Sequence, residues 1–118
     1  MKSLIRKIAY RIRSYIISPL LEHQGCYDAT TQLQLKFLYT NWAQSKKQLP
    51  PLSETGFKVF SQVDEDGILL YIFSIIGTEN KKSVEICAGN GIECNTSNLI
   101  INHGWTGLLV DGNENMVM

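Results

Sequence analysis

Residues 83–111 constrain the fold of this chain more than any other part of the sequence. A short apolar strand at 83–87 ends in a Gly-Asn-Gly turn, a helix-type segment follows at 95–103, and a second short strand covers 107–111. Strand, glycine turn, helix and strand in this order make a βαβ unit, whose two strands run parallel and are joined by a right-handed crossover. The sequence therefore predicts an α/β fold built on a parallel sheet.

The Gly-Asn-Gly turn is of a type that receives a nucleotide-like cofactor. Gly89 and Gly91 let the backbone approach a ligand closely, and the amides at the start of the following helix are expected to face that ligand. In such sites an acid at the end of the next strand accepts hydrogen bonds from ribose hydroxyls, and Asp111 stands at that position. Glu85, an acid inside the first strand, is then expected to orient the glycine loop or to accept from the cofactor's amino group.

Spacing alone leaves three interpretations of this turn open. Dinucleotide-binding enzymes use G-x-G-x-x-G, and Cys94 stands where the third glycine would be. Methyltransferases that bind S-adenosylmethionine use a looser acid-x-G-x-G-x-G turn, and residues 85–91 fit that frame with Cys87 in place of the first glycine. The third interpretation is a βαβ turn that binds no ligand.

Residues 84–114 resemble the front of the cofactor domain in FkbM-type and related class I S-adenosylmethionine-dependent methyltransferases. The likeness rests on the strand and turn VEICAGNG, the Asn-Thr pair that opens the helix, the Gly-Trp-x-Gly turn at 104–107, and the acid Asp111. The upstream segment FSQVDEDGILLYIF, residues 60–73, is similar to the Ser-Gln…Glu-Asp-Gly segment that precedes this strand in the family. Two positions depart from the family pattern, since Cys87 replaces a usual glycine and Asn90 a frequent acid.

The resemblance implies a Rossmann-like methyltransferase fold, truncated after the second strand and preceded by a helical N-terminal extension. The extension would cover residues 1–56 and the front of the methyltransferase domain residues 57–118. S-adenosylmethionine is the implied cofactor and a small molecule or glycan the implied methyl acceptor, with catalysis expected of the full-length relative and not of the isolated chain. The residues predicted to contact the cofactor are Glu85, Cys87, Ala88, Gly89, Asn90, Gly91, Asp111 and Gly112.

The rest of the chain is predicted to be mostly helical. Apolar residues at helical spacing indicate helices over residues 3–17, 28–47 and 66–76, with a proline-rich loop at 49–56. The helix at 28–47 is expected to pack through an apolar side made of Leu33, Phe37, Leu38 and Trp42. The helix at 66–76 is apolar nearly all round, which indicates burial. The acids expected to complement its dipole are Asp64, Glu65 and Asp66.

Local signals also mark the ends of these helices. The candidate caps and stops are, in chain order, Asp28 or Thr30, Gly77, Asn95 or Thr96, and Gly104. His103 is expected to serve as a C-terminal residue of the crossover helix and not as a catalytic base. No catalytic residue is assigned.

Residues 3–17 combine a basic side with an apolar side. A helix of this kind is able to lie on an anionic membrane surface, which would place the protein at the membrane periphery. The other interpretation is an ordinary surface helix with a solvated basic face. These residues carry the main alternative to an enzyme, a non-enzymatic remnant that binds a membrane surface or a partner. A nicotinamide-dependent oxidoreductase is the second alternative, disfavoured by the missing third glycine.

Composition excludes several other classes of protein. The chain has three cysteines, none in a CxxC pair, and two histidines, so neither a metal site nor a disulfide framework is expected. A reducing, cytoplasmic location fits this cysteine content. The formal net charge is zero, and no nucleic-acid partner is expected. The longest apolar stretch, residues 67–77, is shorter than the roughly 20 residues that span a bilayer.

Overall fold

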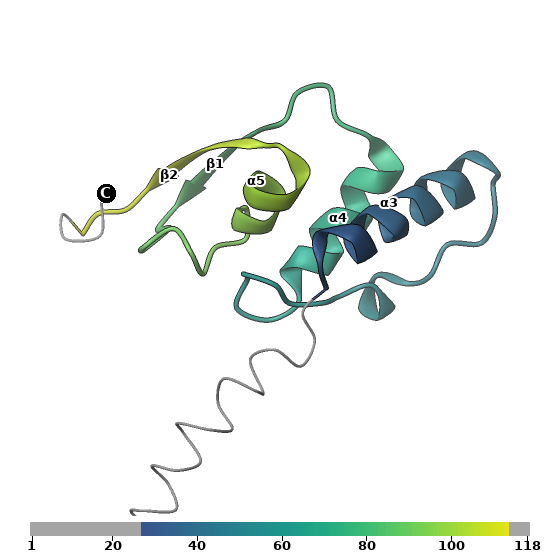
Figure 1. The fold of residues 1–118 in the computed structure, drawn as a ribbon, viewed down its shortest axis with the longest axis horizontal. Coiled ribbons are helices and arrows are strands. Elements are labelled where there is room, and N and C mark those ends of the chain that lie inside the picture. Colours follow the sequence, from purple (N-terminus) through teal and green to yellow (C-terminus); the bar gives the residue numbers. More distant parts are fainter. Residues whose placement is uncertain (1–26, 114–118) are drawn as a thin grey trace, which may run out of the picture.

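The computed structural model describes residues 27–113, and the predicted helix at 3–17, with its membrane contact, lies outside this range. The described chain is α/β, with three helices and a two-stranded parallel sheet. Figure 1 shows α3 and α4 side by side, and α5 next to the sheet. The elements are α3 (Ala29–Gln44), the short 3-10 helix η2 (Leu52–Glu54), α4 (Glu65–Ile76), β1 (Lys82–Ile86), α5 (Ser97–His103) and β2 (Thr106–Val110).

The βαβ unit that the sequence predicts is confirmed. β1 and β2 pair in parallel, with Lys82 opposite Thr106 and Ile86 opposite Val110, and α5 makes the crossover between them. Both strands begin and end one residue earlier than predicted. β1 ends early because Cys87 leaves the extended conformation and takes a φ of 63°.

The helix α5 covers one face of this sheet. Successive strand residues point to opposite faces, and Glu85 and Gly107 lie on the face toward α5. A Cβ atom on Gly107 would stand 2.3 Å from Cδ1 of Ile100, so only glycine allows the helix to pack this close. Leu99 of α5 is buried, and Gly104 ends the helix in the left-handed conformation, as predicted.

The helix α4 begins at Glu65, one residue earlier than predicted, and ends before Gly77, as the sequence indicates, where φ is 75°. The acids at its start do more than complement the helix dipole. Asp66 is buried, and its Oδ2 atom accepts hydrogen bonds from the three successive amides of residues 59–61 at 2.7–2.8 Å. Asp66 therefore holds the preceding loop against the helix, whereas the side chain of Asp64 makes no capping bond.

The start of α3 agrees with the sequence, since Asp28 caps the helix by accepting from the Thr31 amide at 2.7 Å. The prediction for its packing side was wrong. The buried residues of α3 are Gln32 and Tyr39, and three of the four predicted side chains are exposed: Leu33, Phe37 and Leu38. Trp42, the fourth, is half-buried.

The orientation of α3 follows from specific contacts with the helices beside it. The ring of Tyr39 packs edge-on against Tyr71 of α4 with centroids 4.9 Å apart, and the Thr40 hydroxyl donates to the Ser74 carbonyl. These contacts turn a partly polar side of α3 toward α4. The apolar pattern of α3 alone contains no information about them.

A buried polar cluster joins α3 to α5. The Oε1 atom of Gln32 lies 2.8 Å from Nδ2 of Asn98 and 2.8 Å from Nε2 of His103, and Asn102 donates to the Asn98 side chain. Gln32 and Asn98 are completely buried. The side chains of the cluster are hydrogen-bonded to one another, so the cluster fixes how α3 sits on the βαβ unit.

No helix among residues 27–113 is both long and apolar enough to cross a membrane.

Candidate functional site

The loop between β1 and α5, residues 87–96, lies at the carboxyl end of the parallel sheet. Both of its glycines have positive φ angles, 56° at Gly89 and 75° at Gly91, as the turn prediction requires. Cys87 also has a positive φ, of 63°, although it is not a glycine. The helix begins at Ser97, directly after Thr96, one of the two candidate caps, whose side chain makes no capping bond.

Glu85 organises the second half of this loop. Its carboxylate accepts hydrogen bonds from the amides of Asn95 and Thr96, both at 2.9 Å, and from the Thr96 hydroxyl. The first of the two roles expected for Glu85, orienting the loop, is therefore observed. The Asn95 and Thr96 amides point to this internal carboxylate, so they do not face a ligand as the sequence had suggested.

Asp111 organises the first half of the loop from the neighbouring strand. Its Oδ2 atom accepts a hydrogen bond from the Gly89 amide at 2.7 Å, and its Oδ1 atom accepts from the Asn113 amide at 2.8 Å. These two amides, with that of Asn113 the larger contributor, hold the pKa of Asp111 below its ordinary value. The predicted placement of Asp111 beside the glycine loop is confirmed.

The other predicted site residues take different places in the loop. Ala88 is buried and its amide donates to the Val110 carbonyl, which ties the loop to β2. Asn90 is exposed and its side chain accepts from the Ile92 amide at 3.0 Å. Gly112 is exposed, with open space around it. One part of the sheet edge is thus bordered by Gly89, Asn90, Asp111 and Gly112.

Cys94 fills the place of the third glycine in a dinucleotide-binding turn. Its side chain is buried, and the thiol donates to the Ala88 carbonyl at 3.2 Å. The buried Cys94 side chain packs the loop, and its presence prevents a ligand from approaching the backbone closely at this position.

Charge at this edge of the sheet is mainly acidic. Glu85 lies in β1, Glu93 lies in the loop, and Asp111 directly follows β2. The Nζ atom of Lys58 lies 3.9 Å from the Glu93 carboxylate, and both side chains are more than half exposed. This weak ion pair places the segment before α4 next to the glycine loop. Sequence patterns did not single out Lys58, because its neighbour is 35 positions away in the chain.

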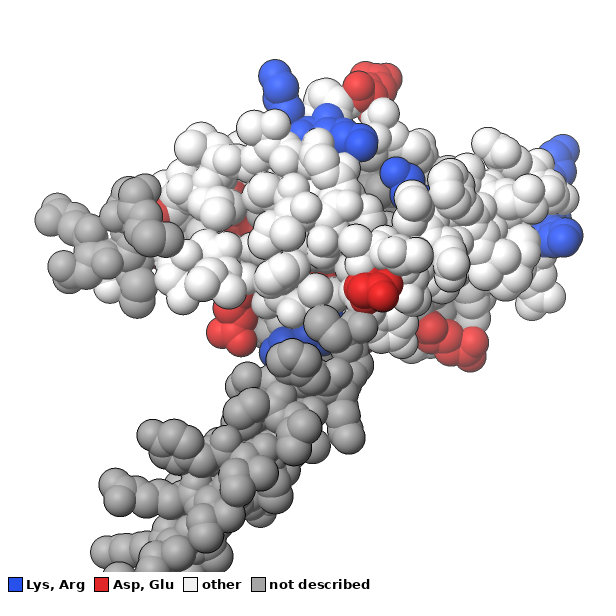
Figure 2. Space-filling model, viewed as in Figure 1, with Lys and Arg blue, Asp and Glu red and all other residues white. Residues whose placement is uncertain are grey.

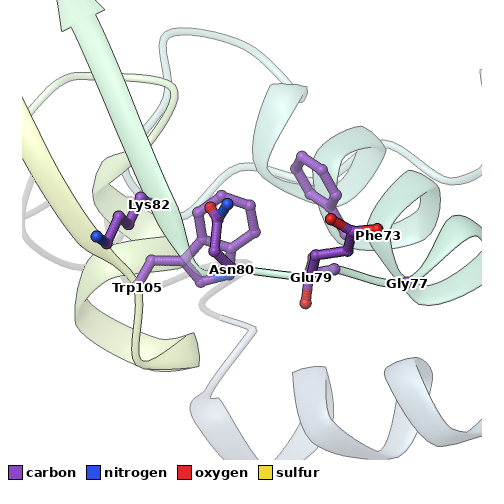
Figure 3. Close-up of a pocket in the computed structure, with 7 residues that line it drawn as sticks. Phe73, Gly77, Glu79, Asn80, Lys82 and Trp105 are labelled. Atoms are coloured by element: carbon purple, nitrogen blue, oxygen red, sulfur yellow. The ribbon is translucent and has the colours of Figure 1, made fainter.

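A separate pocket of about 320 Å³ lies at the opposite, amino end of β1 (Figure 3). Phe73 and Trp105 form its aromatic part, with ring centroids 4.8 Å apart. The remaining lining residues are Gly77, Thr78, Glu79, Asn80 and Lys82. Ligands of open parallel sheets bind at the carboxyl ends of the strands, so this pocket is not part of the predicted cofactor site.

His103 lies in the polar cluster between α3 and α5. Burial, with smaller contributions from the charges of Lys36 and Lys81, holds its pKa below the ordinary value of 6.5. The ring contacts Gln32, and His103 ends α5, as the sequence predicted. Among residues 27–113, no group of three or more His, Cys, Asp or Glu side chains is arranged to hold a metal ion.

Comparison with known proteins gave no match: no family model, no curated protein and no solved structure matches this chain.

Proposed function

We propose that β1, α5 and β2 form the front of a Rossmann-like methyltransferase domain and that their carboxyl edge binds S-adenosylmethionine. The observation that carries this proposal is the hydrogen bond between Asp111 and the Gly89 amide. It places a carboxylate with remaining acceptor capacity beside a glycine loop at the carboxyl end of adjacent parallel strands. That arrangement suits a ribose, whose hydroxyls donate to the acid while the glycines leave room for the rest of the nucleoside.

The charge of the edge favours S-adenosylmethionine over a dinucleotide. A pyrophosphate needs free helix amides and low negative charge nearby. Here the Asn95 and Thr96 amides donate to Glu85, and Asp111 and Glu93 add further negative charge. S-adenosylmethionine instead carries a positive sulfonium, which an acidic edge attracts. The oxidoreductase alternative is disfavoured for the same reason.

Each residue of the site has a distinct part in this proposal. Asp111 accepts from the ribose and at the same time holds the Gly89 amide in place. Glu85 fixes the second half of the loop through Thr96, so the loop is preorganised before the cofactor arrives. S-adenosylmethionine supplies an activated methyl group when bound, and a small molecule or glycan is the proposed acceptor.

The test is the affinity for S-adenosylmethionine of the wild-type chain and of two Asp111 variants, measured by NMR titration because weak binding is expected. Asp111→Ala removes both the ribose acceptor and the Gly89 bond, and should weaken binding about tenfold or more. Asp111→Asn keeps a neutral acceptor, so its affinity should lie between the other two. Glu79→Ala removes an exposed acid at the opposite end of β1 and should leave the affinity unchanged. Equal affinity of wild type and Asp111→Ala would exclude Asp111 from the site.

A further inference from the structure

An exposed ion pair borders the glycine loop. The Nζ atom of Lys58, in the segment before α4, lies 3.9 Å from the carboxylate of Glu93, in the loop itself. The two side chains are 52% and 62% exposed, respectively, and at this distance their charges make no tight hydrogen bond. Exposed pairs of this kind add little to folding stability, so a ligand can separate the two charges at small cost.

Lys58 is the one positive side chain at this edge of the sheet among the residues that the structure describes. Its ammonium group has three N–H donors, one of which donates to the Gln62 carbonyl at 3.2 Å and steadies the side chain. The other lysines of residues 27–113 follow the end of α3, lie beside His103 or stand at the amino end of β1, and they are Lys36, Lys46, Lys47, Lys81 and Lys82. Figure 2 shows few charged side chains over the part of the molecule formed by the sheet and α5. A negative group of a ligand bound at the carboxyl edge therefore has Lys58 as its partner.

We propose that this pair binds the amino-acid end of S-adenosylmethionine. Lys58 donates to the carboxylate of the cofactor, and Glu93 accepts from its ammonium group. Both cofactor groups sit on one carbon atom, so their opposite charges match an exposed pair of opposite charges in the protein. The inference rests on the proposed function, because it takes a ribose bound at Asp111 as its starting point.

The position of Glu93 relative to the proposed ribose site suits this arrangement. Asp111 accepts from the Gly89 amide at 2.7 Å, and Glu93 follows Gly89 by four residues. Four residues of backbone span at most about 14 Å. The turn in which the Gly91 amide donates to the Ala88 carbonyl shortens this distance. The methionine chain of the cofactor extends from the ribose and crosses the loop toward Glu93, which places the positive sulfonium between two acids.

NMR titrations with S-adenosylmethionine and with its decarboxylated form test the inference. The decarboxylated form keeps the ribose, the sulfonium and the ammonium group and lacks only the carboxylate. Lys58→Met should therefore weaken the binding of S-adenosylmethionine about threefold and leave that of the decarboxylated form unchanged. Glu93→Gln should weaken the binding of both ligands by about the same factor, because both carry the ammonium group. Lys82→Met, at the amino end of β1, is the matched control and should change neither affinity.

The two ligands distinguish a direct contact from a structural effect. If Lys58→Met weakens both ligands equally, Lys58 acts only through the fold of the loop and the inference is wrong. If the wild-type chain binds S-adenosylmethionine but Lys58→Met or Glu93→Gln changes neither affinity, the inference is also wrong, whereas the ribose site at Asp111 stands. Absence of S-adenosylmethionine binding by the wild-type chain would overturn both the inference and the proposed function. Both side chains are more than half exposed, so the variants should fold normally, which circular dichroism checks.

Discussion

Replacing Cys87 with glycine should stabilise the protein. Cys87 has a φ of 63°, where the Cβ atom of an ordinary residue clashes with its own backbone at a cost of about 1–2 kcal/mol. Glycine avoids this cost, but it loses more backbone conformational entropy on folding than cysteine does, which costs about 0.5–1 kcal/mol. The difference is a gain of about 0.7 kcal/mol. For a folded unit of this size it corresponds to a rise in Tm of about 3–6 °C.

The assay is thermal unfolding followed by circular dichroism under reducing conditions, with Cys87→Ala as the matched control. Alanine removes the thiol but keeps the Cβ atom, so the backbone strain stays and the stability should remain close to that of the wild type. Cys87 is exposed, and therefore neither change opens a cavity. If the glycine variant melts at or below the temperature of the alanine variant, the backbone at residue 87 is not strained and this account of the loop is wrong.

Two further changes probe other parts of the fold. Asp66→Ala removes the buried carboxylate that accepts from three successive amides and should lower the free energy of unfolding by about 3 kcal/mol. Asp64→Ala should change it by less than about 0.5 kcal/mol in urea unfolding. The pKa of His103 is lowered in the folded state, mainly by burial, so the unfolded chain binds the proton more readily. The contribution of neutral His103 to the free energy of unfolding should therefore be fully present above about pH 7 and should decline as the pH falls through 6.5 toward the folded pKa. His103→Gln should flatten this decline.

Local signals account for the part of the fold that the sequence predicts well. The βαβ unit follows from two short apolar runs, a glycine turn between the first run and a helix, and the stop at Gly104. Each of these signals acts within a few residues. The position of Asp111 beside Gly89 also follows, because the carboxyl ends of adjacent parallel strands meet at one edge.

The errors arise where the path of the backbone brings in a partner that the local sequence pattern does not indicate. Gln32 is buried on α3 because its amide bonds Asn98, 66 positions later, and a hydropathy pattern gives no weight to such a contact. Glu85 could not be assigned to the Asn95 and Thr96 amides without knowing how the loop returns to its own strand. Asp66 was expected to act on its own helix, but the loop before the helix folds back so that its amides reach the carboxylate.

The most direct test of the proposed function is an NMR titration of the isotope-labelled chain with S-adenosylmethionine, followed amide by amide. Residues 27–113 supply the loops after two strands, so the affinity should be weak, with a dissociation constant on the order of millimolar. We expect the amides of Gly89, Asn90, Gly91 and Gly112 to shift progressively as the cofactor is added, and NAD⁺ at the same concentrations to leave them in place. Absence of shifts at about 10 mM S-adenosylmethionine, or shifts centred on the pocket beside Trp105, would contradict the account.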